Sequence, residues 1–162
     1  MRDVPLDVRR SAHGPIVAER DGAPIAMRVA AIDRPRLFEQ FWKMGLAKNL
    51  AEWQNSMRMQ QLPLFNTAYA DRDGHIAYVY NATLPVHSTG DYRFWQGVLP
   101  ADRSDLIATT IVPYDAVPKV IDPPTGWVQN SNDMPWTSVY PPLLDSTKFA
   151  AGFAATQGIT QR

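Results

Sequence analysis

Hydrophobic and polar positions follow regular patterns over the first half of the chain. Residues 7 to 32 predict two strands, because RRSAHGPIVAER and APIAMRVAAI are joined by Asp21-Gly22, a pair favoured in tight turns. Further along, Phe65, Thr67 and Tyr69 alternate with smaller or polar residues. After a turn at residues 71 to 74, Ile76, Tyr78 and Tyr80 continue the period of two. Residues 65 to 81 therefore predict a second hairpin.

Two short helices are predicted between these hairpins. Pro35 lies where the first helix would begin, and Asn49 with Glu52 resembles a capping box that starts the second. The apolar stripe of the first helix is Phe38, Phe41, Trp42, Gly45 and Leu46, and that of the second is Leu50, Trp53 and Met57. Pro63 is expected to end the second helix.

The second half of the chain has weaker patterns. Residues 82 to 125 are broken by prolines and predict extended or looped chain, with one more strand at residues 126 to 130. The order strand, strand, helix, helix, strand, strand, then irregular chain predicts an α+β fold, with an antiparallel sheet and helices on one face. We therefore divide the chain into a strand-helix-hairpin portion, 1–81, and a Pro/Trp-rich loop portion, 82–162.

Composition narrows the class of protein. The 162 residues suffice for one domain, and 45% hydrophobic with 20% charged residues is typical of globular chains. Sixteen basic residues balance sixteen acidic ones, which gives no reason to expect nucleic acid as a partner. No apolar run is long enough to span a bilayer. The absence of cysteine excludes disulfides and thiolate catalysis.

Several side chains invite a functional interpretation, and each has a simpler one. His13, His75 and His87 lack the spacing of metal ligands, so we expect structural or surface roles. The stretch DRDG at 71–74 fits a turn better than a calcium loop, because its glycine comes fourth instead of sixth. Ser11, beside His13, and Ser131 lie outside any nucleophile-elbow motif, which makes both weak nucleophile candidates.

Aromatic and carboxamide side chains leave two questions open. Trp95, Trp127 and Trp136 either line a ligand site or, as we favour, anchor loops to the core. Asn66 interrupts an apolar alternation. Its carboxamide either caps the turn after Pro63 or, held on a rigid strand, donates hydrogen bonds to a developing oxyanion. Spacing alone does not decide between these roles.

An ordered set of motifs resembles the penicillin acylases and their acyl-homoserine-lactone and aculeacin acylase relatives. The motifs are RRSAHGPIV, then LFEQFWKMGLAKNLAEWQNSMRMQQLPLFNTAYADRDGHIAYVY, then WQGVLP, then VPKVIDPPTGWVQNSNDMPW. They extend from about residue 8 to 136 in the order that the family has. The sequence QNSNDMPW resembles the aculeacin-type branch more closely than the penicillin G branch.

The resemblance implies an N-terminal-nucleophile amide hydrolase with a four-layer αββα sandwich of antiparallel sheets. In this family an N-terminal Ser attacks the amide of penicillins, acyl-homoserine lactones or lipopeptides, and a strand Asn holds the oxyanion; that Asn matches Asn66. The family also implies a periplasmic or secreted protein, no organic cofactor, and calcium in some relatives.

The sequence departs from the family at the nucleophile. The S-N-x-W signature of the nucleophile segment is absent, none of the nine glycines precedes Ser or Thr, and Val86-His87 stand where some relatives have Arg. We therefore expect one partial domain, an internal β-subunit segment that is inactive without the remaining α- and β-subunit segments. The alternative is a truncated, non-catalytic remnant or a module that binds a ligand or partner.

Overall fold

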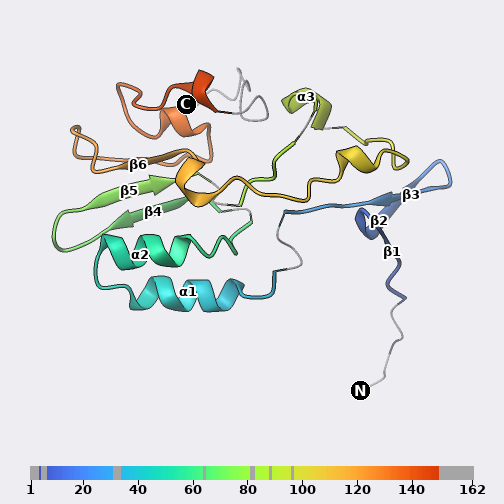
Figure 1. Cartoon of the computed structure of the whole chain (residues 1–162), viewed down its shortest axis with the longest axis horizontal. Helices are drawn as coiled ribbons and strands as arrows, with labels where there is room; N and C mark the ends of the chain where they lie inside the picture. The colour runs from blue at the N-terminus through green and yellow to red at the C-terminus, as the bar shows by residue number, and fades with distance from the viewer. Residues whose placement is uncertain are drawn as a thin grey trace.

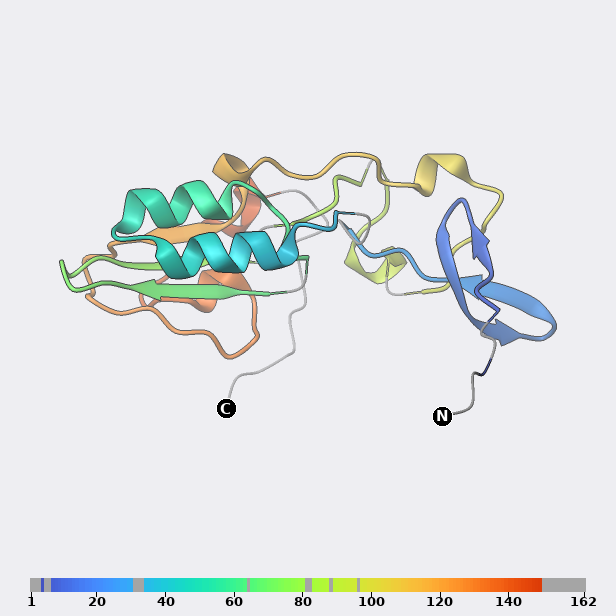
Figure 2. The ribbon, with the colours of Figure 1, turned by 90° about the horizontal axis from the view of Figure 1, so that it is seen from below.

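The computed structural model describes residues 4, 7–30, 34–63, 65–80, 83–87, 89–95 and 97–149. The described chain is elongated, with a small sheet at one end and a larger sheet covered by helices at the other (Figure 1). Extended chain that comes before helix α1 (Leu37–Leu46) and after strand β5 (Ile76–Val79) in the sequence runs between the two ends (Figure 2).

The small sheet contains β1 (Arg10–Ser11), β2 (Gly14–Arg20) and β3 (Ala23–Ala26), paired antiparallel in the order β1-β2-β3. Asp21 and Gly22 have φ values of 51° and 76°. Positive φ at both central residues is what a type I′ hairpin turn requires. Two strands around this turn are confirmed, but the second ends at Ala26, before the predicted residue 32, and residues 31 and 32 lie outside the described chain. Strand β1 is an additional short strand.

Helices α1 (Leu37–Leu46) and α2 (Leu50–Met57) pack together on one side of the larger sheet (Figure 2). The predicted capping box is confirmed at the start of α2. The Asn49 Oδ1 atom accepts a hydrogen bond from the Glu52 amide at 2.9 Å, and the Glu52 carboxylate accepts one from the Lys48 amide at 3.0 Å. These bonds satisfy amides that the first helical turn leaves without partners.

The predicted end of α2 is wrong. The helix ends at Met57, well before Pro63, because the chain reverses at Gln60, which has a left-handed φ of 48°. The side-chain Nε2 atom of Gln60 donates to the Val112 carbonyl at 2.7 Å, and the backbone carbonyl of Gln60 accepts from the Thr83 hydroxyl at 3.0 Å. Contacts with the second half of the chain therefore fix this turn, and no local sequence signal marks it.

The larger sheet contains β4 (Thr67–Ala70), β5 (Ile76–Val79) and β6 (Lys119–Ile121), antiparallel in the order β4-β5-β6. The register between β4 and β5 confirms the predicted second hairpin. In the central strand, residues 77 to 79 are at most 1% exposed. Successive side chains of a strand point to opposite faces, so both faces of β5 are covered.

The strand predicted at residues 126 to 130 is wrong, and the third strand of this sheet is β6 instead. The pair Pro123-Pro124 follows β6, and Gly126 has a φ of 73°. Proline cannot donate to a strand ladder, and positive φ turns the chain, so residues 126 to 130 leave the sheet. Gln129 holds this stretch in place, because its backbone amide donates to the Ser138 carbonyl at 2.8 Å and its side-chain Nε2 donates to the Thr137 carbonyl at 2.6 Å.

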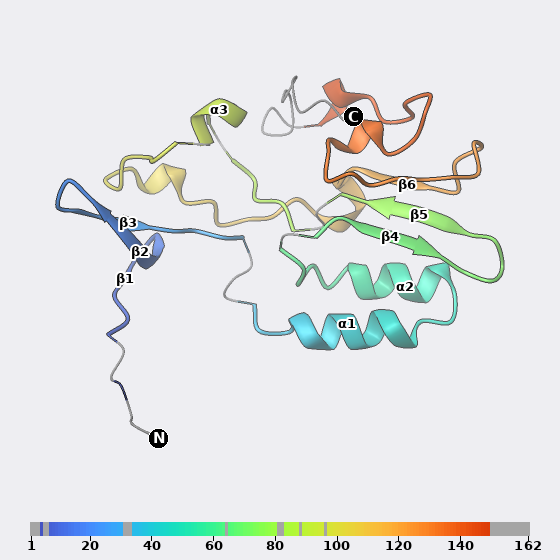
Figure 3. The ribbon, with the colours of Figure 1, turned by 180° about the vertical axis from the view of Figure 1, so that it is seen from behind.

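The core lies between the helices and the larger sheet. Its buried residues are Trp53, Met57, Leu62, Ala77, Val79, Leu84, Tyr114 and Val117. Residues 122 to 149 lie on the side of the sheet away from the helices (Figure 3). The structure confirms an α+β fold with antiparallel sheets and long irregular segments.

The apolar stripe that identified α1 in the sequence faces solvent. Phe38 and Trp42 are 83% and 70% exposed, whereas Gln40 on the same helix is fully buried. Leu37 and Met44 lie on the side of Gln40 and pack against the core. Helix α1 is therefore apolar on two sides, a property typical of helices that are covered on both.

Candidate functional site

Asn66 lies immediately before β4, one residue outside the paired strand on which the sequence interpretation placed it. Its side chain is half-buried, and its Nδ2 atom donates a hydrogen bond to Oδ1 of Asn130 at 3.3 Å. Asn130 is 64 residues further along the chain, in the stretch QNSND. The fold therefore brings two of the motif segments together at their carboxamides.

The loop around Asn130 orients its carboxamide. The Asn130 Oδ1 atom also accepts from the Asn132 amide at 2.9 Å, and the Ser131 hydroxyl donates to the Gln129 side chain at 2.8 Å. With Oδ1 occupied by two donors, the NH₂ group of Asn130 is directed elsewhere, and it has no acceptor among the described residues. Asn130 is exposed, so this NH₂ group can donate to a group brought from outside the chain.

Buried glutamines hold residues 61 and 62, which come shortly before Asn66 in the chain. The Gln61 amide donates to Oε1 of Gln40 at 2.6 Å, and the Gln61 side chain donates to the Met59 carbonyl at 2.8 Å. Gln40 is fully buried and Leu62 is 1% exposed. Gln61 and Leu62, a few residues before Asn66, are thus anchored to the core.

The turn between β4 and β5 confirms the interpretation of DRDG as turn chemistry. Asp71 Oδ1 accepts from the Asp73 and His75 amides at 3.0 and 2.9 Å, and the Tyr69 hydroxyl donates to Oδ2 at 2.8 Å. Burial alone would raise the pKa of Asp71, but these hydrogen bonds outweigh it and lower the pKa. Burial, followed by the contact with Asp71, raises the pKa of Tyr69 to about 12.

The three histidines do not form one cluster with acidic side chains, although His13 and His87 line the same cavity. His75 is 2.8 Å from the Asp122 carboxylate, which raises the pKa of the imidazole by hydrogen bonding and charge. His87 stacks on Trp95 with ring centroids 3.6 Å apart, and burial lowers its pKa. In the described part of the chain, no three His, Cys, Asp or Glu side chains gather to hold a metal ion. These residues do not assemble a calcium site, and calcium in a complete enzyme stays a prediction.

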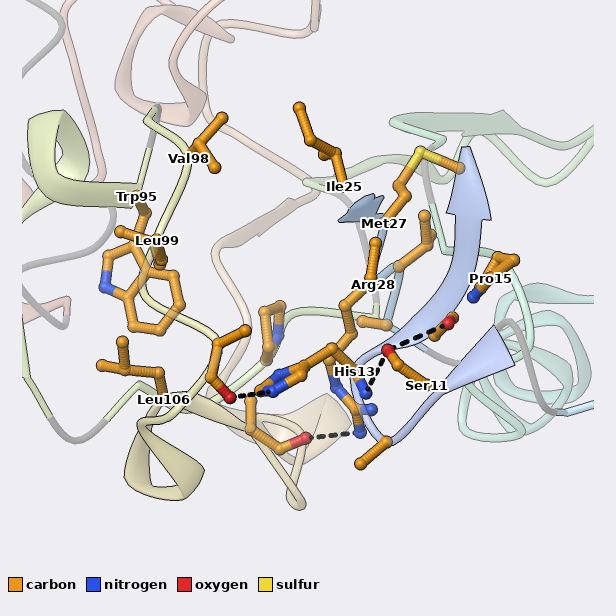
Figure 4. A pocket seen from close by; sticks show the side chains of 18 of the residues that line it. Ser11, His13, Pro15, Ile25, Met27, Arg28, Trp95, Val98, Leu99 and Leu106 are labelled. Carbon is orange, nitrogen blue, oxygen red and sulfur yellow. Dashed lines mark hydrogen bonds between the residues drawn. The ribbon is translucent and has the colours of Figure 1, made fainter. Parts of the chain in front are cut away.

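Neither candidate serine is paired with a base. The His13 amide donates to Ser11 Oγ at 3.2 Å, and Ser11 Oγ donates to the Gly14 carbonyl at 3.3 Å. The His13 imidazole instead contacts the Ala101 carbonyl through Nε2 at 2.8 Å (Figure 4). Sequence proximity of Ser11 and His13 therefore does not produce a nucleophile.

The tryptophans of the second half have different environments. Trp95 lines a cavity and donates from Nε1 to the Thr89 carbonyl at 2.8 Å. Trp127 is 42% exposed, and Trp136 is half-buried in the short helix Pro135–Thr137. Anchoring in the main core is thus wrong for Trp127, which the structure leaves at the surface.

No helix among the described residues has both the length and the apolar composition needed to cross a membrane.

Three known proteins similar to this chain are acylases by name. Penicillin G acylase of Escherichia coli is 32% identical over 100 residues, which covers 55% of this chain and 10% of the relative. Acyl-homoserine lactone acylase PvdQ of Pseudomonas savastanoi pv. phaseolicola is 25% identical over 159 residues, covering 84% of this chain and 20% of the relative. Penicillin acylase 2 proenzyme of Pseudomonas sp. (strain SE83) is 26% identical, with coverage of 88% and 18%.

The penicillin amidase family model matches residues 2–158, and the chain belongs to that family. It spans between a tenth and a fifth of the length of the curated relatives it matches.

Sequence reasoning did not pair Asn130 with Asn66. The two asparagines of QNSND, which flank a serine in an otherwise irregular stretch, were the available signal. The sequence does not show that these asparagines lie close to the β4–β5 hairpin, because that proximity depends on the tertiary fold.

Proposed function

We propose that this chain forms the oxyanion-binding part of an acylase that hydrolyses linear acyl amides. The single observation that carries the proposal is the Asn66–Asn130 pair, in a chain of the penicillin amidase family. The names of the relatives make penicillins and acyl-homoserine lactones the first substrate classes to examine.

The chemistry assigned to the pair is stabilisation of negative charge. When a nucleophile adds to an amide carbonyl, the oxygen becomes an oxyanion; it returns to a carbonyl when the amine leaves with a proton. Preorganised N–H donors stabilise that oxyanion without reorganising during the reaction. Asn66 contributes either its own carboxamide or the orientation of the Asn130 carboxamide, since a hydrogen bond couples the two.

The nucleophile in this proposal is the N-terminal Ser that the family resemblance implies, supplied by another acylase segment. Within the described residues, the two candidate serines, Ser11 and Ser131, form hydrogen bonds that include no base. An oxyanion donor without its nucleophile has no reaction to assist. The isolated chain is therefore expected to show no amide turnover, and an acylase reconstituted with a nucleophile-bearing segment is expected to show it.

The exposed stripe of α1 supports association with such a segment. Phe38, Phe41, Trp42 and Leu46 are 83%, 45%, 70% and 59% exposed, and Phe65 packs edge-on against Phe41 with ring centroids 6.2 Å apart. A contiguous apolar surface rimmed by charge is typical of protein–protein interfaces. We assign this surface to the remaining acylase segments, with the β4–β5–β6 sheet as one sheet of an αββα sandwich. A periplasmic or secreted location stays a prediction.

The test of the site uses single and double alanine variants in the reconstituted enzyme. Asn66→Ala is expected to lower kcat by ~10²- to 10³-fold, the loss typical of one oxyanion donor, while the melting temperature stays nearly unchanged. Because Asn130 is coupled to Asn66, the double variant is expected to be little slower than the slower single variant. An unchanged kcat in Asn66→Ala would refute the site, and a lower melting temperature with kcat intact would return Asn66 to a structural role.

The test of the surface compares two substitutions on α1. Trp42→Lys is expected to leave the unfolding of the isolated chain unchanged and to weaken association with the nucleophile-bearing segment. Lys43→Gln, on the charged side of the same helix, is the control and is expected to change neither. If reconstitution yields no turnover although the segments associate, the alternative of a non-catalytic binding module is favoured.

A further inference from the structure

A cavity of about 760 Å³ lies between the small sheet and the loop of residues 97 to 111 (Figure 4). Its volume is within the range of small-molecule sites. Ile25 and Met27 form one wall, and Val98, Leu99 and Leu106 form the facing wall, with Trp95 beside them (Figure 4). The cavity shares no lining residue with the Asn66–Asn130 pair.

Large apolar side chains that line the cavity are partly exposed. Met27 and Val98 are 45% and 59% exposed although both are large apolar side chains. Burying such surface is favourable by about 25 cal/mol for each Å² removed from water. A ligand with an apolar body would cover these side chains and gain that free energy.

The charged side chains among the described lining residues of the cavity are all basic. Arg10, Arg28 and Arg34 line it, and no Asp or Glu is among the described lining residues. Arg28 reaches across the cavity and donates from one guanidinium nitrogen to the Ala108 carbonyl at 3.0 Å (Figure 4). A guanidinium has five N–H donors, so a single carbonyl leaves most of them to bind an anion.

His87 adds a polar atom that the described chain does not satisfy. Its Nδ1 atom is buried and has no hydrogen-bond partner among the described residues. The ring also lines the cavity and stacks on Trp95. Buried polar atoms are normally paired, so a missing partner is consistent with a ligand or water that reaches this atom.

We propose that this cavity binds an apolar carboxylate, with its tail between β3 and residues 97 to 111 and its carboxylate against Arg28. Charge complementarity selects the anion, because arginines face the cavity and acidic residues do not. The apolar walls select the tail. The site goes beyond the proposed function, since binding needs no nucleophile; an acylase reaction nevertheless releases a ligand of this class.

The test measures binding of three probes to the full chain by isothermal titration calorimetry. Decanoate, decanol and decyltrimethylammonium share an apolar tail and differ in head-group charge. Decanoate is expected to bind at least about tenfold more tightly than either of the others, since a charge-assisted hydrogen bond contributes about 1.5 to 3 kcal/mol. No binding of decanoate, or equal binding of decanoate and decanol, overturns the proposal.

Variants locate the site. Arg28→Gln is expected to weaken decanoate binding about tenfold and to leave decanol binding unchanged, whereas Arg28→Lys retains part of the preference. Arg9→Gln is the matched control, because Arg9 precedes the same small sheet, pairs with Glu19 and does not line the cavity. Equal losses in Arg9→Gln and Arg28→Gln would indicate non-specific attraction and overturn the assignment. The assay involves no turnover, so its failure leaves the proposed acylase function to be tested by reconstitution.

Discussion

The buried hydrogen bond between Gln40 and Gln61 gives a test of how much one satisfied backbone amide contributes to the stability of the fold. Gln40 is fully buried in α1, and its Oε1 atom accepts a hydrogen bond from the Gln61 amide at 2.6 Å. Its Nε2 atom faces the sulfur atoms of Met57 and Met44 at 3.6 and 3.9 Å. The substitution Gln40→Met keeps a long, unbranched side chain and removes the oxygen atom that accepts from the Gln61 backbone amide.

The expected loss of unfolding free energy follows from the Gln61 backbone amide, which loses its acceptor. A buried N–H group without a partner costs about 1 to 3 kcal/mol. Methionine has nearly the helix propensity of glutamine, and the two neighbouring methionines accept an apolar side chain, which offsets part of the cost. The expected net loss is about 1 to 2 kcal/mol of unfolding free energy. For a chain of this size that lowers Tm by about 2 to 8 °C.

The assay is urea unfolding followed by circular dichroism, with the midpoint and the m value fitted separately. Phe38→Met is the control, because Phe38 is on the same helix and 83% exposed, and its stability should stay within about 0.5 kcal/mol of the parent. A Gln40→Met variant as stable as the parent would refute the reasoning. It would show that the Gln61 amide needs no partner or finds another.

Three further predictions concern a glycine in β2, the N-cap of α2 and the ion pair between His75 and Asp122. Gly14→Ala should lower Tm, with a loss of more than ~1 kcal/mol, because a Cβ atom would lie 2.2 Å from the Met27 carbonyl oxygen at a φ of 135°. Asn49→Ala should lose about 1 kcal/mol in urea unfolding, since it removes the N-cap of α2. Asp122→Asn should flatten the pH dependence of Tm between about pH 6 and 8, where the parent loses stability as His75 deprotonates.

The direction of that pH dependence follows from the pKa of His75. Asp122 raises it, so the folded chain holds the proton more tightly than the unfolded chain. The stabilisation is complete below the unfolded pKa, about 6.5, and disappears as the pH rises through the folded pKa. The pKa of Asp122 is lowered, first by the Ile76 amide and then by His75, so its own contribution is lost only as the pH falls below about 4. A parent Tm that rises from pH 6 to 8 would contradict this account.

Local signals predicted the elements whose geometry is set by neighbouring residues. Asp21-Gly22 and the capping pair Asn49 and Glu52 act within a few residues of the chain, and the structure confirms both. The second hairpin is of the same kind, because the Asp71 carboxylate closes its turn locally.

Features that depend on distant contacts were missed. The end of α2 is set by bonds from Gln60 to residues of the second half, and β6 forms at residues 119 to 121 because β5 offers an edge there. Periodicity predicted that α1 is a helix, but it did not show which of its two apolar sides faces the core. For the candidate site, motif resemblance identified Asn66, and only the fold supplied its partner Asn130.

Helix α1 carries residues needed for the stability of this chain on one side and residues expected to be needed for association on the other. A mutational scan of the isolated chain for stability should tolerate polar residues at Phe38 and Trp42 and reject them at Leu37 and Met44, since only the second pair packs in the core. A scan selected for activity in a reconstituted acylase should reject them at all four positions. The difference between the two maps would outline the docking surface, residue by residue.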